Sequence, residues 1–167
     1  MEDLKDTCAG VPHRHKVSSS FPNGAFLDGD EAVERIVEFV AASRHEAEAR
    51  LYLSLHCLGG AIAKPAPDWS AFAFRQQPFL LQYQAWWATT GDPRLGDRCI
   101  RWVRDFRRQM DGFTEFAFIN FPDRDLAADR KTLLRYYYAQ NLERLIEVKR
   151  RVDPQDLFRF GMSIPTA

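Results

Sequence analysis

Hydrophobic and polar positions alternate in some stretches of the chain and recur at helical spacing in others. Residues 16–21 are predicted as a short strand, and the Pro-Asn-Gly sequence at 22–24 predicts a turn. Valine and isoleucine then recur every three or four residues behind Asp30, a residue type that caps helices, which predicts a helix over 30–46. Three leucines alternate with polar residues over 50–58, a pattern typical of a half-buried strand.

The second half of the chain continues this alternation of elements. A loop rich in proline and aromatic residues is expected over 61–77, followed by a long strand over 79–87. An amphipathic stripe predicts a helix over 93–110, and 115–121 is predicted as a strand. A last helix is expected over 125–151. It should stop before an Asp-Pro pair, because a residue that precedes proline disfavours the α conformation.

The predicted elements follow one another in the order β-α-β-β-α-β-α. The first six elements, joined in this order, favour a four-stranded antiparallel sheet with helices on one face, which is the ferredoxin-like class of α+β folds. The last helix and the tail are an addition to that unit. We therefore expect a flexible N-terminal segment over 1–15, an α+β domain over 16–124, and a C-terminal helix and tail over 125–167.

Composition limits the classes of partner. The chain has 167 residues, enough for one domain with its own core, and its 23 basic residues are balanced by 23 acidic ones. This balance indicates no nucleic-acid partner and no membrane surface. The three cysteines are widely spaced and show no metal-ligand spacing, so no metal site is expected. Reduced cysteines and the lack of an apolar leader predict a cytoplasmic protein.

Several sequence tracts, taken in order, resemble one known family. The tracts are Lys16-Val-Ser-Ser-Ser-Phe, Gly59-Gly60-Ala-Ile, Ser70-Ala-Phe-Ala-Phe-Arg75, the strand 79–87 that ends in Trp, Phe118-Ile-Asn-Phe-Pro-Asp123, and the long C-terminal tract Tyr136-Tyr-Tyr-Ala-Gln-Asn-Leu-Glu-Arg-Leu through Phe158. In this order they are similar to the substrate domain and C-terminal segment of the berberine-bridge-enzyme-like, FAD-linked oxidases.

The resemblance implies a substrate-type domain over 16–124 and a C-terminal segment that closes over a flavin. The FAD-binding domain of the family is absent from this sequence, so the resemblance implies either FAD or, in this shorter chain, no cofactor. The sequence also departs from the family at Ala139, Asp156 and Met162, where relatives usually have Gly, Asn and Gln. The last two departures weaken the expected docking of the tail on a flavin domain.

Two tyrosines and an asparagine near the C-terminus are the first candidates for chemistry. Tyr137 and Tyr138 lie three or four residues before Asn141, so the three side chains occupy neighbouring faces of one predicted helix. In the family a tyrosine at this position can act as a base, which requires a phenol with a lowered pKa. Asn141 would contact the cofactor only if flavin is supplied. The alternative is that both tyrosines pack the helix on the sheet and form hydrogen bonds through their hydroxyls.

The strands supply further candidates. Tyr52, Ser54 and His56 share one face of their strand, while Gln82 and Tyr83 point to opposite faces of the next one. The face that points away from the helices would line the substrate cavity in the family. We therefore name Tyr52, Ser54, Gln82 and Tyr83 as candidate substrate-binding residues. His56 is a candidate catalytic base, with an exposed or structural histidine as the alternative.

Two loop residues complete the candidate set. Asn120, at the end of a predicted strand, would face the same cavity, or would instead satisfy the turn that follows. Arg75, in the Phe-rich loop, could bind an anionic group, or could instead anchor the loop. We include both as candidate substrate-binding residues.

Three functions are compatible with these features. The chain could be a truncated relative of the FAD-linked oxidoreductases, acting in natural-product metabolism as a cyclase or proton-transfer enzyme. It could be one subunit of a split oxidase that a separate FAD-binding chain completes. It could also be a non-catalytic binding or scaffold protein. The expected partners are a small-molecule substrate and either a second copy of this chain or a flavin-domain protein.

Overall fold

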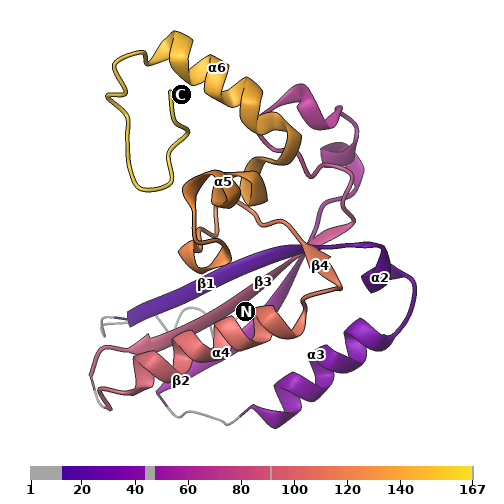
Figure 1. The fold of residues 1–167 in the computed structure, drawn as a ribbon. Coiled ribbons are helices and arrows are strands. Elements are labelled where there is room, and N and C mark those ends of the chain that lie inside the picture. The colour runs from indigo at the N-terminus through magenta and orange to yellow at the C-terminus, as the bar shows by residue number, and fades with distance from the viewer. Residues whose placement is uncertain (1–12, 44–47, 91, 167) are drawn as a thin grey trace.

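The structure is a computed structural model that describes residues 13–43, 48–90 and 92–166. It has one sheet, with two helices on one face and the C-terminal segment on the other (Figure 1). The strands are β1 (His13–Pro22), β2 (Ala49–Cys57), β3 (Phe79–Ala88) and β4 (Thr114–Glu115). The α-helices are α2 (Gly24–Leu27), α3 (Glu31–Ala42), α4 (Leu95–Gln109), α5 (Arg130–Tyr138) and α6 (Leu142–Val152).

The sheet has four strands in the spatial order β2-β3-β1-β4. Each neighbouring pair is antiparallel, with Ala88 opposite His13 and Leu53 opposite Tyr83. This order is that of the ferredoxin-like unit, so the predicted α+β class is confirmed.

The main core lies between β3 and the helices α3 and α4. Leu81 and Tyr83 on β3 are fully buried against Val103 and Phe106 of α4. Leu51 and Leu53 of β2 pack against the same cluster, so this face of β2 meets the helices. The opposite face of the sheet, which we call the free face, carries the alternate residues of β2 and β3.

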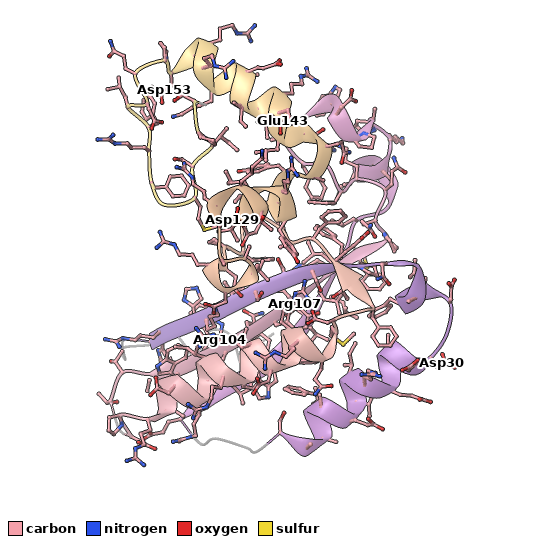
Figure 2. The ribbon with its side chains drawn as sticks, viewed as in Figure 1. Asp30, Arg104, Arg107, Asp129, Glu143 and Asp153 are labelled. Carbon is pink, nitrogen blue, oxygen red and sulfur yellow. The ribbon has the colours of Figure 1, made fainter. Side chains whose placement is uncertain are left out.

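The beginnings of the first elements differ slightly from expectation. β1 starts at His13, so residues 13–15 belong to the sheet and not to a loose segment, while residues 1–12 lie outside the described part of the chain. The predicted turn is a short helix, α2, in which the Asn23 side chain accepts a hydrogen bond from the Phe26 amide. Asp30 precedes α3 as expected (Figure 2), but its side chain makes no capping hydrogen bond.

The strand predicted over 115–121 is wrong beyond its start. β4 contains only two residues, because Phe116 adopts a left-handed backbone conformation with φ of 56° and ends the extended chain. The following amides find other partners: Ala117 N donates to Tyr136 O, and Phe118 N donates to the Ser19 hydroxyl. The segment therefore curls over the free face.

The single helix predicted over 125–151 is also wrong. α5 and α6 are separate helices, joined by a 3₁₀ turn (Ala139–Asn141) and preceded by another 3₁₀ turn (Arg124–Leu126). Ala139 breaks the helix, with φ of 46° and ψ of −126°. Asp129 caps the start of α5 by accepting a hydrogen bond from Thr132 N (Figure 2).

The tail after α6 turns back along α5. Met162 is buried with Leu133, Tyr137 and Ala117 in a small cluster. The Asp153 carboxylate accepts hydrogen bonds from the amides of Leu157 and Phe158, which stabilises the turn after α6. No helix in the described ranges is both long and apolar enough to cross a membrane.

Candidate active-site pocket

A pocket of about 580 Å³ lies on the free face of the sheet. Its apolar wall includes Leu80 of β3 together with Phe118 and Phe121 of the curled segment. Its polar groups are predicted site residues that the fold brings together from four parts of the chain: His56, Arg75, Asn120, Tyr137 and Tyr138. A concave, mainly apolar site with a few convergent polar groups is typical of a small-molecule pocket.

The Tyr137 hydroxyl is fully engaged by the backbone. It accepts a hydrogen bond from Asp123 N at 2.7 Å and donates one to Asp123 O at 3.1 Å. The side chain is 2% exposed, and burial raises its pKa to about 12. The expectation of a base with a lowered pKa is therefore wrong for Tyr137, and its role in packing and hydrogen bonding is the one the structure shows.

Tyr138 presents the free phenol. It lines the pocket, is half-buried, and its hydroxyl has no hydrogen-bond partner among the residues that the structure describes. Burial raises its pKa as well, so the expected lowered pKa is wrong here too. A protonated phenol in a pocket is a hydrogen-bond donor and a general acid, not a base.

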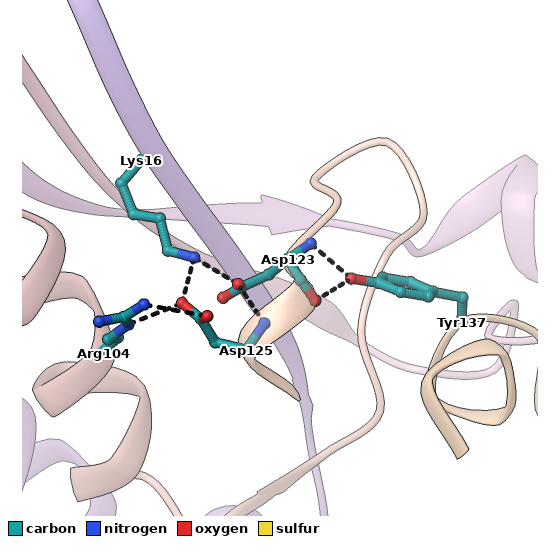
Figure 3. Close-up of polar contacts among 5 residues, drawn as sticks. All are labelled: Lys16, Arg104, Asp123, Asp125 and Tyr137. Atoms are coloured by element: carbon teal, nitrogen blue, oxygen red, sulfur yellow. Dashed lines mark hydrogen bonds and ion pairs between the residues drawn. The ribbon is translucent and has the colours of Figure 1, made fainter. Parts of the chain in front are cut away.

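An ion-pair network on the other side of Asp123 holds the segment to which Tyr137 is bonded (Figure 3). The Asp123 carboxylate, 3% exposed, pairs with Lys16 of β1 and accepts a hydrogen bond from Asp125 N. Asp125 pairs with Arg104 of α4 at 2.7 Å and with Lys16 at 2.7 Å. Arg104 first, and then Lys16, lower the pKa of Asp125 to about 2, although partial burial opposes the shift. The network joins β1, α4 and the turn before α5.

His56 lies at the rim of the pocket and bonds to the strand beside it. Its Nε2 is 2.7 Å from Gln82 Oε1, and its ring lies 5.9 Å from that of Phe121. Gln82 points to the free face, as Ser54 does, whereas Tyr83 points to the helices. Tyr83 is fully buried and hydrogen-bonded to the Ser20 hydroxyl at 2.7 Å, so the prediction that it binds substrate is wrong.

The free face also carries two residues that the sequence analysis did not select. Gln84 donates to the Ser54 hydroxyl at 3.1 Å, and its Oε1 accepts from Trp86 Nε1 at 3.2 Å. Tyr52 lies opposite Gln84 in the strand register. The signal for Gln84 and Trp86 was their period-two spacing from Gln82, which places all three on one face.

Arg75 is held by its own loop. Its Nη2 donates to the Ser70 hydroxyl at 2.6 Å, and its Nη1 donates to Ile62 O at 3.3 Å. Its guanidinium lies over the rings of Trp69 and Phe72, at 5.1 and 5.7 Å from their centroids. The loop-anchoring alternative therefore describes Arg75, whereas its binding of an anion stays a prediction.

The two asparagines differ in what they contact. Asn120 is exposed in a turn closed by a hydrogen bond from Phe121 N to Phe118 O, and it lines the pocket. Asn141 is buried, and its Nδ2 donates to Pro67 O at 2.8 Å and to Ser70 O at 3.0 Å. The amide hydrogens of Asn141 thus bind the loop after β2 to the helix junction. Its contact with a flavin, expected only if flavin is supplied, stays a prediction.

The described residues do not make a binding site for a whole FAD. Gly59 and Gly60 precede a 3₁₀ helix of only four residues (Gly60–Ala63), too short to bind a pyrophosphate at its N-terminus. A Cβ added to either glycine would meet no protein atom within 4 Å, so neither glycine is required by close packing against another part of the chain. Groups of three or more side chains that could hold a metal ion are also absent from the part of the chain that the structure describes. If FAD takes part, another polypeptide segment has to bind its phosphates.

Comparisons with known proteins show which family the chain resembles. The family model "Berberine and berberine like" matches residues 117–165. An FAD-linked oxidoreductase of Bacillus subtilis, YgaK, is 30% identical over 146 residues, which are 86% of this chain and 30% of the relative. Aclacinomycin-N/aclacinomycin-A oxidase of Streptomyces galilaeus is 32% identical over 127 residues, which are 67% of this chain and 23% of the relative.

Solved structures show the same fold. The glucooligosaccharide oxidase of Acremonium strictum superposes with a TM-score of 0.76 at 20% identity, over 93% of this chain and 33% of the oxidase. The relatives that match this chain in sequence are FAD-linked oxidoreductases, and the solved oxidase shares its fold. The chain belongs to the berberine-bridge-enzyme-like family, and it spans about a third or less of the length of each of these relatives.

Proposed function

We propose that this chain binds a small organic substrate of the natural-product kind in the free-face pocket and moves protons on it. The reaction would be a proton transfer or a cyclisation without net oxidation. The observation that carries this proposal is that Tyr138 and His56 line one apolar pocket, and that the Tyr138 hydroxyl and His56 Nδ1 have no hydrogen-bond partner among the described residues. Enzyme relatives with natural-product names, such as the aclacinomycin oxidase, support the substrate class.

The two residues suit complementary roles. Tyr138 keeps its proton because its pKa is raised, so it can donate that proton to a substrate carbonyl oxygen. The His56 ring can accept the proton of a substrate hydroxyl. When that oxygen attacks the carbonyl carbon of the same molecule, one C–O bond forms and the carbonyl π bond breaks. One proton leaves for His56 and one arrives from Tyr138, so the electrons balance without an oxidant.

A binding and turnover experiment tests this function. A panel of hydroxylated aromatic ketones would be screened by calorimetry, and the best binders would be followed by mass spectrometry for an isomer of unchanged mass. Tyr138→Phe and His56→Ala should each lower turnover by about 10²–10⁴-fold. Tyr136→Phe is the matched control, because this neighbour does not line the pocket. Unchanged turnover in both pocket variants would refute the assignment, and binding without turnover would favour a binding protein.

A second candidate function rests on the tail. Leu157, Phe158 and Phe160 are 72%, 80% and 69% exposed, and Val152 at the end of α6 is 68% exposed. Exposed apolar groups gathered in one segment are typical of an interaction site. We propose as the alternative that this segment docks a separate flavin-binding polypeptide, which would complete an oxidase.

Co-purification tests the docking. The chain would be co-expressed with a flavin-binding domain of a relative, and the purified complex would be examined for a visible flavin band. Leu157→Ser with Phe158→Ser should abolish the complex, whereas Val33→Ser, on the exposed side of α3, should not. Sedimentation velocity of the chain alone distinguishes this partner from a second copy. A dimer lost in the same double variant would assign the tail to self-association.

A further inference from the structure

The polar side chains of the free face form one continuous hydrogen-bonded chain whose direction can be worked out. His56 Nε2 lies 2.7 Å from Gln82 Oε1, and Gln82 Nε2 donates to Gln84 Oε1 at 3.3 Å. Gln84 Oε1 also accepts from Trp86 Nε1 at 3.2 Å. The chain therefore runs from Trp86 at one end to His56 at the other.

The indole of Trp86 fixes the direction, because an indole N–H is only a donor. The Trp86 N–H must therefore face the oxygen of the Gln84 amide, and not its nitrogen. In this orientation Gln84 Nε2 donates to the Ser54 hydroxyl. Gln84 Oε1 in turn requires a donor from Gln82, which turns Gln82 Oε1 toward His56. An oxygen facing the ring can only accept, so Nε2 of His56 must carry a proton.

We propose that Trp86, Gln84 and Gln82 are positioning residues that hold neutral His56 as the Nε2–H tautomer. Its Nδ1 is then the bare, proton-accepting nitrogen. Nδ1 makes no hydrogen bond to any described residue, and His56 lines the pocket. The use of Nδ1 as a base rests on the proposed function, whereas the tautomer itself does not.

The position of Trp86 supports such a structural role. Its ring stacks on His15 of β1, with centroids 4.6 Å apart and an angle of 18° between the planes. The indole is therefore held from the neighbouring strand, and its N–H is kept on Gln84. Gln82 and Gln84 are 9% and 8% exposed, so water does not readily replace their mutual hydrogen bond.

Nuclear magnetic resonance of the ¹⁵N-labelled chain at alkaline pH, where imidazole is neutral, tests the tautomer directly. Long-range ¹H–¹⁵N correlation distinguishes a protonated ring nitrogen from a bare one, and His56→Ala identifies the signals of this ring. If both glutamine amides were turned over, Gln84 Nε2 would face the Trp86 N–H, and two donors would oppose each other. We therefore expect the Nε2–H form to exceed the Nδ1–H form by about tenfold or more.

Variants then test the cause. Trp86→Phe keeps an aromatic ring beside His15 but removes the N–H, so the two amides can turn over and the tautomers should become nearly equal. Gln84→Met removes the amide that orients Gln82, so the two tautomers should again become nearly equal. This variant provides the test if Trp86→Phe fails to fold. Gln84→Glu still accepts from Trp86 and Gln82 and should keep the Nε2–H form.

The outcomes separate this inference from the proposed function. A wild-type ring that is mainly Nδ1–H, or an Nε2–H form that persists in both Trp86→Phe and Gln84→Met, would overturn it. A locked Nε2–H tautomer with full turnover in His56→Ala would confirm the positioning chain and refute the base instead.

Discussion

Ala139 occupies a backbone conformation that an alanine adopts only under strain, and replacing it by glycine should stabilise the protein. Its φ of 46° and ψ of −126° lie in a region that is open to glycine but closed by the Cβ of other residues. The break is needed because it ends α5 and lets Asn141 bond the loop after β2. Ala139→Gly would keep the break and remove the strain.

The magnitude follows from three opposing contributions. Strain at such a position costs about 1–3 kcal/mol. Glycine adds freedom to the unfolded chain, which costs about 0.4–1 kcal/mol. The lost methyl group is only partly buried against the Phe-rich cluster, so it contributes less than the ~0.8 kcal/mol of a buried methylene. Ala139→Gly should therefore raise the free energy of unfolding by about 1 kcal/mol, or Tm by about 2–4 °C.

Thermal and urea unfolding followed by circular dichroism would measure this change. The matched control is Ala41→Gly, on the exposed surface of α3, where ordinary helix geometry makes glycine unfavourable by about 1 kcal/mol. The two variants should thus shift the unfolding midpoint in opposite directions. If Ala139→Gly destabilises the chain as much as the control does, the strain at Ala139 is refuted.

Three further predictions concern the anchors of the pocket. Tyr137→Phe should lower the free energy of unfolding by about 1–3 kcal/mol, since it leaves the Asp123 backbone groups unpaired, and urea unfolding against Tyr136→Phe measures this difference. Asn141→Ala should lower the free energy of unfolding by a similar ~1–3 kcal/mol, because two carbonyls of the loop after β2 lose their donor. It should also speed proteolysis of that loop, and an unchanged cleavage rate would contradict the anchoring role. Asp125 titrates lower in the folded chain, at about 2 against its ordinary 3.8, so its stabilisation is present above pH 3.8 and is lost as pH falls through about 2. Because this carboxylate is 35% exposed, we expect about 1 kcal/mol or less, and a pH series with Asp125→Asn, which should lack this loss, measures it.

The ferredoxin-like unit could be predicted because apolar residues recur with a regular period in its strands and helices. Leu51, Leu53 and Leu55 alternate with polar residues, and this period of two predicts both the strand and its faces. The three valines of 30–46 likewise predicted a helix, although all three are exposed on α3. The period of apolar residues is a local property of the sequence, so pattern reasoning finds the element even where it misjudges which side chains are buried.

The breaks and the polar networks could not be found in this way. Alanine favours helices, so nothing local in the sequence indicates a positive φ at Ala139, and only comparison with the glycine usual in the family points to it. The pairing of Lys16 with Asp123 joins residues 107 positions apart, and spacing does not reveal it. Trp86 was not selected from the sequence, although its N–H orients the polar chain on the free face.

The two adjacent tyrosines show how the fold and the pocket depend on each other. Successive helical residues point in different directions, so Tyr137 can reach the Asp123 backbone while Tyr138 lines the pocket. Asp123 is itself held by Lys16 on β1, on the helix-facing side of the sheet (Figure 3). An ion pair outside the pocket therefore supports the helix that carries the free phenol. Lys16 does not line the pocket, so a change at Lys16 should act on the pocket through Asp123 and Tyr137.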